Sequence, residues 1–82
     1  MARFTAKSSR EVESLLKHHG FVLVEKKRGS HALWASPDDL DNPVFVPMNK
    51  KSIPRGTLKG ILDVAGISRN EAVKFWSGQT AQ

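Results

Sequence analysis

The sequence predicts an α+β fold in which helices cover one face of a three-stranded antiparallel sheet and leave the other face free. One observation is that the period of the apolar residues changes along the chain, from helical to strand-like and back to helical. The other is that the strand-like runs stand together and are separated by turn residues. The expected order is helix, three strands, helix and a C-terminal helical extension, so one face of the sheet is available for binding.

The first helix is predicted over residues 9–18. Ser8 and Glu11 have the spacing of a capping box, in which each side chain hydrogen-bonds the backbone N–H of the other residue. Apolar residues recur at helical spacing within the segment, at Val12, Leu15 and Leu16. Gly20 stands where a left-handed C-terminal cap is expected, so the helix should end just before it.

Two strands are predicted next, over residues 21–27 and 31–36, joined by a hairpin turn. In the second strand His31, Leu33 and Ala35 should share one face, with Ala32 and Trp34 on the other. Residues 36–43 carry turn chemistry without apolar periodicity, so we expect a connecting loop. A short third strand is predicted over residues 44–46 and ends at a proline.

A second helix is predicted to start near Pro54, because the missing N–H of a proline is not needed in the first turn of a helix. Its apolar residues are Leu58, Ile61, Leu62 and Ala65, and Gly66 should close it. Ser68 and Glu71 repeat the capping-box spacing and predict a last short helix, with fraying expected from Ser77 onward.

Composition narrows the class of protein. The chain of 82 residues is expected to form a single domain, and it has no cysteine for a disulfide, a thiolate metal site or a nucleophile. No signal peptide or bilayer-spanning run is apparent, which favours a soluble cytoplasmic protein. The net charge of +5 favours nucleic acid or an acidic protein as partner.

His31 is the candidate proton-transfer residue. It follows Gly29 and Ser30 in the hairpin turn, with cations just before it, where an imidazole could act on a phosphate backbone. The other interpretation is that Gly29 only supplies a hairpin turn and that His31 is an ordinary first residue of the second strand. Further cations near the turn and near the second helix could join it in one RNA-binding surface: Lys26, Lys27, Arg28, Lys50, Lys51, Arg55 and Lys59. Ser30, in the turn itself, belongs to the same predicted surface. Free N–H groups at that helix start also favour anions, whereas scattered solvated charges remain the alternative.

Other chemistry-bearing residues have structural explanations. His18 and His19 suit the C-terminal end of the first helix. Asp38 and Asp39 fit a turn better than an acid-base pair, and no metal-ligand spacing is present. The aromatic residues could stack on bases, but each is expected to be a core or partner-interface residue: Phe4, Phe21, Trp34, Phe45, Phe75 and Trp76.

Four motifs resemble the HicA family of bacterial mRNA-interferase toxins, also known as YcfA-like. They are Ser-Ser-Arg-Glu with His19-Gly20-Phe21, Gly29-Ser30-His31, Val44-Phe45-Val46-Pro47, and residues 54–62 with Ala65-Gly66-Ile67-Ser68. The resemblance covers about residues 8–68 and implies a single HicA-like domain with an extension over residues 69–82. At positions where that family commonly has further histidines, this chain has Ala32 and Met48-Asn49.

The resemblance implies a fold like that of double-stranded-RNA-binding domains, cleavage of mRNA, and neutralisation by a cognate HicB-like antitoxin. It places His31 at the catalytic histidine of the family, and we expect a monomer or an antitoxin-bound hetero-oligomer. No cofactor or metal is expected, because the sequence has no metal-ligand cluster. Two other classes compete with such an endoribonuclease: a non-catalytic RNA-binding module, and a small interaction protein whose basic face docks an acidic partner.

Overall fold

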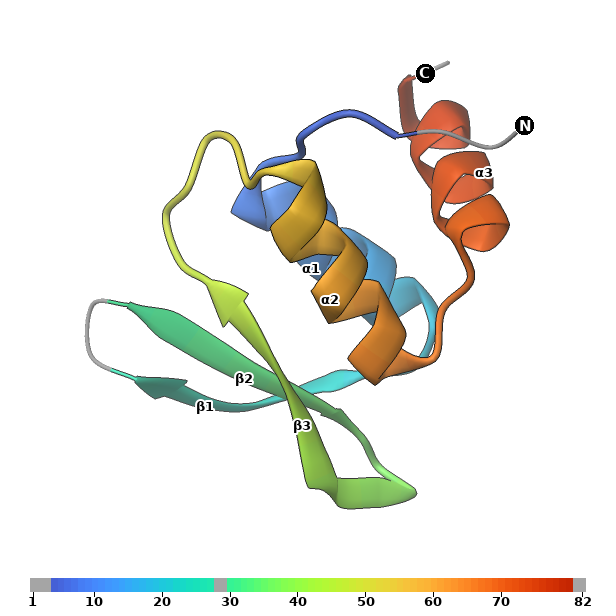
Figure 1. Cartoon of the computed structure of the whole chain (residues 1–82). Coiled ribbons are helices and arrows are strands. Elements are labelled where there is room, and N and C mark those ends of the chain that lie inside the picture. Colours follow the sequence, from blue (N-terminus) through green and yellow to red (C-terminus); the bar gives the residue numbers. More distant parts are fainter. Residues whose placement is uncertain (1–3, 28–29, 81–82) are drawn as a thin grey trace.

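The structure is a computed structural model that describes residues 4–27 and 30–80. It confirms the α+β fold and the order of its elements, consistent with a double-stranded-RNA-binding-domain-like arrangement followed by a C-terminal helix. The elements are α1 (Ser9–His18), β1 (Val22–Lys27), β2 (His31–Ser36), β3 (Asp39–Pro47), α2 (Arg55–Ala65) and α3 (Arg69–Thr80). Helices α1 and α2 lie over one face of the sheet, and α3 lies on the far side of α1 from the hairpin turn (Figure 1).

Helix α1 has the predicted bounds because both of its ends are capped. The Glu11 N–H donates to the Ser8 hydroxyl at 3.1 Å, and the Ser8 N–H donates to the Glu11 carboxylate at 2.9 Å. At the other end Gly20 has a φ of +86°, the left-handed conformation in which a residue with a Cβ is strained. Both local signals are confirmed.

The sheet is antiparallel with strand order β1-β2-β3. On β2, Ala32 and Trp34 stand opposite Val46 and Val44 of β3, and all four are buried under the helices. Leu33 stands opposite Phe45 and lies outside that core, so the two faces of β2 are those predicted by alternation. The face away from the helices is called the open face below.

The expected loop over residues 36–43 is wrong in most of its length, because β3 begins at Asp39 rather than Val44. Ser36 pairs with Asp39, so β2 and β3 form a tight hairpin. Strand β3 lies at the edge of the sheet, where a proline such as Pro43 is tolerated because its missing N–H breaks no ladder. The turn-forming residues in the first half of β3 therefore lead to the wrong prediction of a loop there.

Helix α2 begins at Arg55 with Pro54 as its N-cap, and Gly66 closes it with a φ of +72°. Helix α3 continues to Thr80, so the expected fraying from Ser77 is wrong as far as that residue. Trp76 anchors α3, since it is buried and its indole N–H donates to the Glu11 carbonyl at 3.1 Å. The core thus takes side chains from all three helices and from β2 and β3.

Among the described residues, no helix combines the length and the apolar character needed to cross a bilayer.

Candidate functional site

His31 is the first residue of β2 and its side chain is exposed. In the sheet it stands between Lys27 of β1 and Pro47 of β3. By alternation along β2 it lies on the open face, because its neighbour Ala32 is buried under the helices. The imidazole is therefore presented to solvent at the end of the open face nearest the β1–β2 turn.

Lys27 brings a cation to the same row of the sheet. Its amine lies 3.3 Å from the Glu25 carboxylate, and both side chains are about half exposed, at 53% each. An ion pair so exposed contributes little to stability, typically about 0–1 kcal/mol. A phosphate at His31 can therefore compete for Lys27 without a large loss elsewhere.

The β1–β2 turn is tied to the end of β3. The Ser30 N–H donates to the Lys27 carbonyl at 3.3 Å, and the Ser30 carbonyl accepts from the Met48 N–H at 2.8 Å. Arg28, named above as an RNA-binding candidate, and Gly29 lie outside the described residues. The backbone around His31 is thus held from both neighbouring strands.

Ser9 holds the loop that follows β3. Its hydroxyl donates to the Pro47 carbonyl at 2.6 Å and accepts from the Lys50 N–H at 2.9 Å. The Ser9 N–H also donates to the Lys50 carbonyl, at 2.9 Å. Between them Asn49 takes a φ of +57°, a left-handed conformation that asparagine tolerates. The start of α1 therefore fixes both Pro47, the residue opposite His31, and the first part of the loop between β3 and α2, which carries Lys50 and Lys51 and is called the basic loop below.

Sequence reasoning missed Ser9, which is the buried polar residue of the described chain at 7% exposure. The capping spacing drew attention to its neighbour Ser8, whose partner is three residues away. The partners of the Ser9 side chain are 38 and 41 residues away, so no local pattern could have indicated them.

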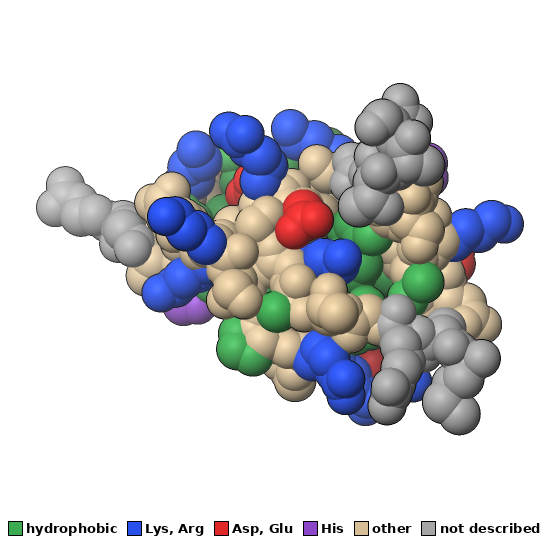
Figure 2. Space-filling view, turned by 90° about the horizontal axis from the view of Figure 1, so that it is seen from above, with side chains coloured by type: hydrophobic (Ala, Val, Ile, Leu, Met, Phe, Trp, Pro, Cys, Tyr) green, Lys and Arg blue, Asp and Glu red, His purple; other side chains and the backbone are tan. Residues whose placement is uncertain are grey.

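The remaining cations fall into separate groups. Lys50, Lys51 and Arg55 are exposed on the loop between β3 and α2 and at the start of α2. This loop rises from the end of β3 on the side of the β1–β2 turn and leads to the start of α2 (Figure 1). On its way it contacts Ser9 at the start of α1. Figure 2 shows Lys and Arg side chains at several separate places around one view of the molecule.

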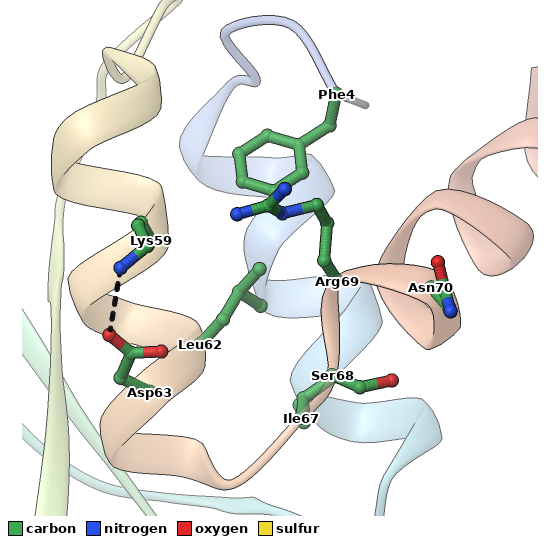
Figure 3. Close-up of a pocket in the computed structure, with 8 residues that line it drawn as sticks. All are labelled: Phe4, Lys59, Leu62, Asp63, Ile67, Ser68, Arg69 and Asn70. Atoms are coloured by element: carbon green, nitrogen blue, oxygen red, sulfur yellow. Dashed lines mark ion pairs between the residues drawn. The ribbon is translucent and has the colours of Figure 1, made fainter. Parts of the chain in front are cut away.

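Lys59 lies in a different environment. Its amine is 3.8 Å from the Asp63 carboxylate, and both residues line a pocket between α2 and the start of α3 (Figure 3). In that pocket the Arg69 side chain extends toward Phe4 (Figure 3). Every residue that lines the pocket lies outside the sheet, so it is separate from the row that holds His31.

Lys26 is directed away from Lys27. It stands opposite Ala32, which is buried under the helices, and it lines a shallow pocket with Trp34 and Lys17. The Lys17 amine lies 5.8 Å from the centre of the Trp34 ring. Of the adjacent pair in β1, Lys27 alone shares the face of His31.

Phe45 is not a core residue, so of the expected core or partner-interface roles only the interface role is left for it. Its side chain is 54% exposed, between two buried valines of β3. The two tryptophans are buried, and Phe4, Phe21 and Phe75 pack partly buried against the core. The run Val-Phe-Val is apolar throughout, so the sequence does not reveal which face the helices cover.

The other polar candidates have structural partners. The His18 ring lies 4.7 Å from the Phe75 ring. The Asp39 carboxylate accepts two hydrogen bonds from the Asn42 amide, at 2.9 and 3.0 Å. In the described ranges no group of three or more histidine and carboxylate side chains could hold a metal ion.

Comparison with known families adds an independent finding. A family model described as the HicA toxin of bacterial toxin-antitoxin systems matches residues 9–67, more than two thirds of the chain. The match spans α1, the sheet and α2, and it includes the row of Lys27, His31 and Pro47. No curated protein sequence matches the chain.

Proposed function

Because the chain belongs to the HicA toxin family of bacterial toxin-antitoxin systems, we propose that it is an endoribonuclease that cleaves mRNA. The observation that carries the proposal is the exposed His31 on the open face, with Lys27 beside it. Imidazole is the side chain suited to move a proton near neutral pH, and an amine can offset charge on a phosphate.

The proposed reaction uses a nucleophile supplied by the RNA. His31 accepts the proton of a ribose 2′-hydroxyl, and the 2′-oxygen attacks the adjacent phosphorus. The bond to the 5′-oxygen breaks, and this oxygen takes a proton from water as it leaves, while His31 returns to its neutral form by releasing its proton to solvent. The products are a 2′,3′-cyclic phosphate and a 5′-hydroxyl end. Lys27 offsets the charge that gathers on the phosphate oxygens.

The basic loop supplies the approach to this site. Lys50, Lys51 and Arg55 are exposed and can contact phosphates that flank the scissile one. Lys26 and Lys59 have less direct positions, so RNA bound at His31 reaches them only by extending over other surfaces. Ser30 sits at the turn and completes the proposed RNA-binding set, together with Arg28.

Membership of a toxin family implies a cognate antitoxin as partner. We propose a HicB-like protein whose acidic contact surface covers the row of His31 and Lys27, because the same cations that attract RNA also attract carboxylates. The toxin is then a monomer when free and part of a hetero-oligomer when inhibited, in the cytoplasm where mRNA is found.

The test is cleavage of labelled RNA by the purified protein in EDTA. The parent is expected to cut RNA and to leave intact a strand with a 2′-deoxyribose at the scissile position. His31→Ala is expected to abolish cleavage and growth arrest while binding RNA as well as the parent does, since the exposed imidazole packs against no core. His18→Ala is the matched control, because it removes another exposed histidine away from the open face.

Several results would contradict the proposal. Cleavage by His31→Ala at the parent rate would remove its catalytic role. Efficient cutting of DNA would exclude the 2′-hydroxyl as nucleophile, and loss of cutting in EDTA would exclude a metal-independent reaction. RNA binding without cleavage by the parent would favour the alternative, a non-catalytic RNA-binding module.

A further inference from the structure

Phe45 is a large apolar side chain on the open face of the sheet. It stands opposite Leu33 of β2, and Leu33 stands opposite Glu25 of β1, so these residues form one row across the sheet. On the open face, the next row toward the β1–β2 turn is the one of Lys27, His31 and Pro47. Phe45 and His31 are therefore diagonal neighbours, at a separation of about 7–8 Å between backbones in a regular sheet.

The two rows differ in what they can bind. The row of His31 carries the Lys27 amine, which attracts a phosphate. The row of Phe45 carries no cation: its other end is Glu25, whose carboxylate lies 3.3 Å from the Lys27 amine of the neighbouring row. Leu33 lies between Glu25 and Phe45 in this row, and its side chain is only 9% exposed. The surface beside Phe45 is therefore apolar. An uncharged flat group fits the second row, and a charged group fits the first.

A single-stranded RNA segment has this alternation of charged backbone and flat base. We propose that Phe45 is the stacking platform for a nucleobase next to the phosphate held at His31; this rests on the proposed endoribonuclease function. Unpaired bases stack on exposed aromatic side chains regardless of their sequence, because every base has a π-face. The site thus takes single-stranded RNA in preference to a duplex, whose bases are already stacked.

The test measures stacking and affinity apart from cleavage. All proteins carry His31→Ala so that RNA survives, and the probe is a short single-stranded RNA with one 2-aminopurine base. Binding to the protein that carries His31→Ala alone, the parent in this experiment, is expected to quench the fluorescence of this base. Phe45→Ala and Phe45→Leu are both expected to abolish the quenching and to raise the Kd roughly 5- to 100-fold. Phe45→Tyr keeps an aromatic ring, so it should keep the quenching and leave the Kd close to that of the parent.

Three controls separate stacking from a general loss of apolar surface or of fold. Val64→Ala removes apolar surface that is 60% exposed on α2, and it should leave the Kd unchanged. An RNA with an abasic site in place of the stacked base should bind the parent and Phe45→Ala equally. The salt dependence of the Kd should be the same for the parent and Phe45→Ala, since the substitution removes no charge.

The outcomes separate this proposal from the function on which it rests. If the enzyme with His31 intact cleaves RNA but Phe45→Leu binds the probe with full quenching, the stacking role is wrong and the enzyme remains. If no variant binds RNA at low salt, both proposals are wrong. If Phe45→Ala weakens only the antitoxin complex, Phe45 belongs to a protein interface instead.

Discussion

Ser9 connects the first helix with the surroundings of His31 through a hydroxyl that both donates and accepts. Ser9→Ala leaves the Lys50 N–H and the Pro47 carbonyl without this partner. Because each of these part-buried hydrogen bonds contributes roughly 0.5–1.5 kcal/mol, we expect the free energy of unfolding to fall by about 1–3 kcal/mol. Urea denaturation followed by circular dichroism measures the change.

Ser52 provides the control, since it is an exposed serine of the same loop. Ser52→Ala is expected to change the free energy of unfolding by less than about 0.5 kcal/mol. Amide hydrogen exchange gives a local readout: the Lys50 amide should exchange faster in Ser9→Ala than in the parent. Equal exchange at Lys50 in both proteins would show that Ser9 does not hold the loop.

At the level of single residues, the sequence predicts positions that depend on local spacing. The face of His31 follows from alternation along β2, and the structure agrees. The separation of Lys26 from Lys27 follows from the same alternation, but grouping the cations by sequence proximity concealed it. The contacts of Ser9 and the exposure of Phe45 depend on long-range packing, which one sequence without its fold does not contain.

The start of α3 has a capping box whose strength depends on pH. The Ser68 N–H donates to the Glu71 carboxylate at 3.2 Å, and the Glu71 N–H donates to the Ser68 hydroxyl at 3.1 Å. The backbone hydrogen bond from Ser68, with a smaller contribution from its side chain, lowers the pKa of Glu71 below its ordinary value. A carboxyl group with a lowered pKa stabilises the fold above its ordinary pKa, and this stabilisation is lost as the pH falls through the folded value.

Glu71→Gln separates this titration from the capping hydrogen bond, because glutamine can also accept at this position but carries no charge. The parent is expected to be more stable than Glu71→Gln at neutral pH, and the difference should shrink as the pH falls through the range in which the carboxyl protonates. Urea denaturation at several pH values from about 7 to about 3 measures it. A difference that stays constant over this range would show that the charge of Glu71 does not support the cap.

Among the elements, the limits of α1 and the ends of α2 follow from capping residues, which act within a few positions. Strand β3 shows where such local reasoning fails. Aspartate, asparagine and proline favour turns in isolation, but residues 39–43 belong to β3 at the sheet edge. This part of β3 pairs with β2 at Asp39, and its register is irregular up to the next pair, at Val44. Helix α3 likewise extends beyond the expected point, with Trp76 holding it against α1.

At the scale of the whole molecule, the described cations lie on several surfaces rather than at one: Lys27 is on the open face, Lys26 is on the opposite face of the sheet, and Lys59 lines the pocket beside α2. Long-range attraction to RNA therefore depends on the total charge, whereas the local fit at His31 depends on the cations nearest to it. Lys27 stands opposite His31 in the sheet. Lys51 lies on the basic loop, which begins after Pro47, the other residue opposite His31, and is held by Ser9. These two residues should therefore affect binding more than cations of equal charge elsewhere.

Charge reversal tests this difference, because every Lys→Glu substitution lowers the net charge equally. Lys27→Glu and Lys51→Glu are each expected to weaken RNA cleavage and antitoxin binding together, and to make both less sensitive to salt. Each removes a cation that a phosphate or a carboxylate contacts. Lys74→Glu, on the exposed surface of α3, is the matched control and should change both much less. Titrations at several salt concentrations supply the affinities and their salt dependence.

The joint effect on cleavage and inhibition is the decisive part of this prediction. RNA and the antitoxin would compete for the same cations only if the antitoxin covers the row of His31. Should Lys27→Glu abolish cleavage yet leave antitoxin affinity and its salt dependence unchanged, inhibition must act from another surface. The α3 side would then be the first place to examine, because α3 lies beyond the residues that match the family and packs on the opposite side of α1 from the hairpin.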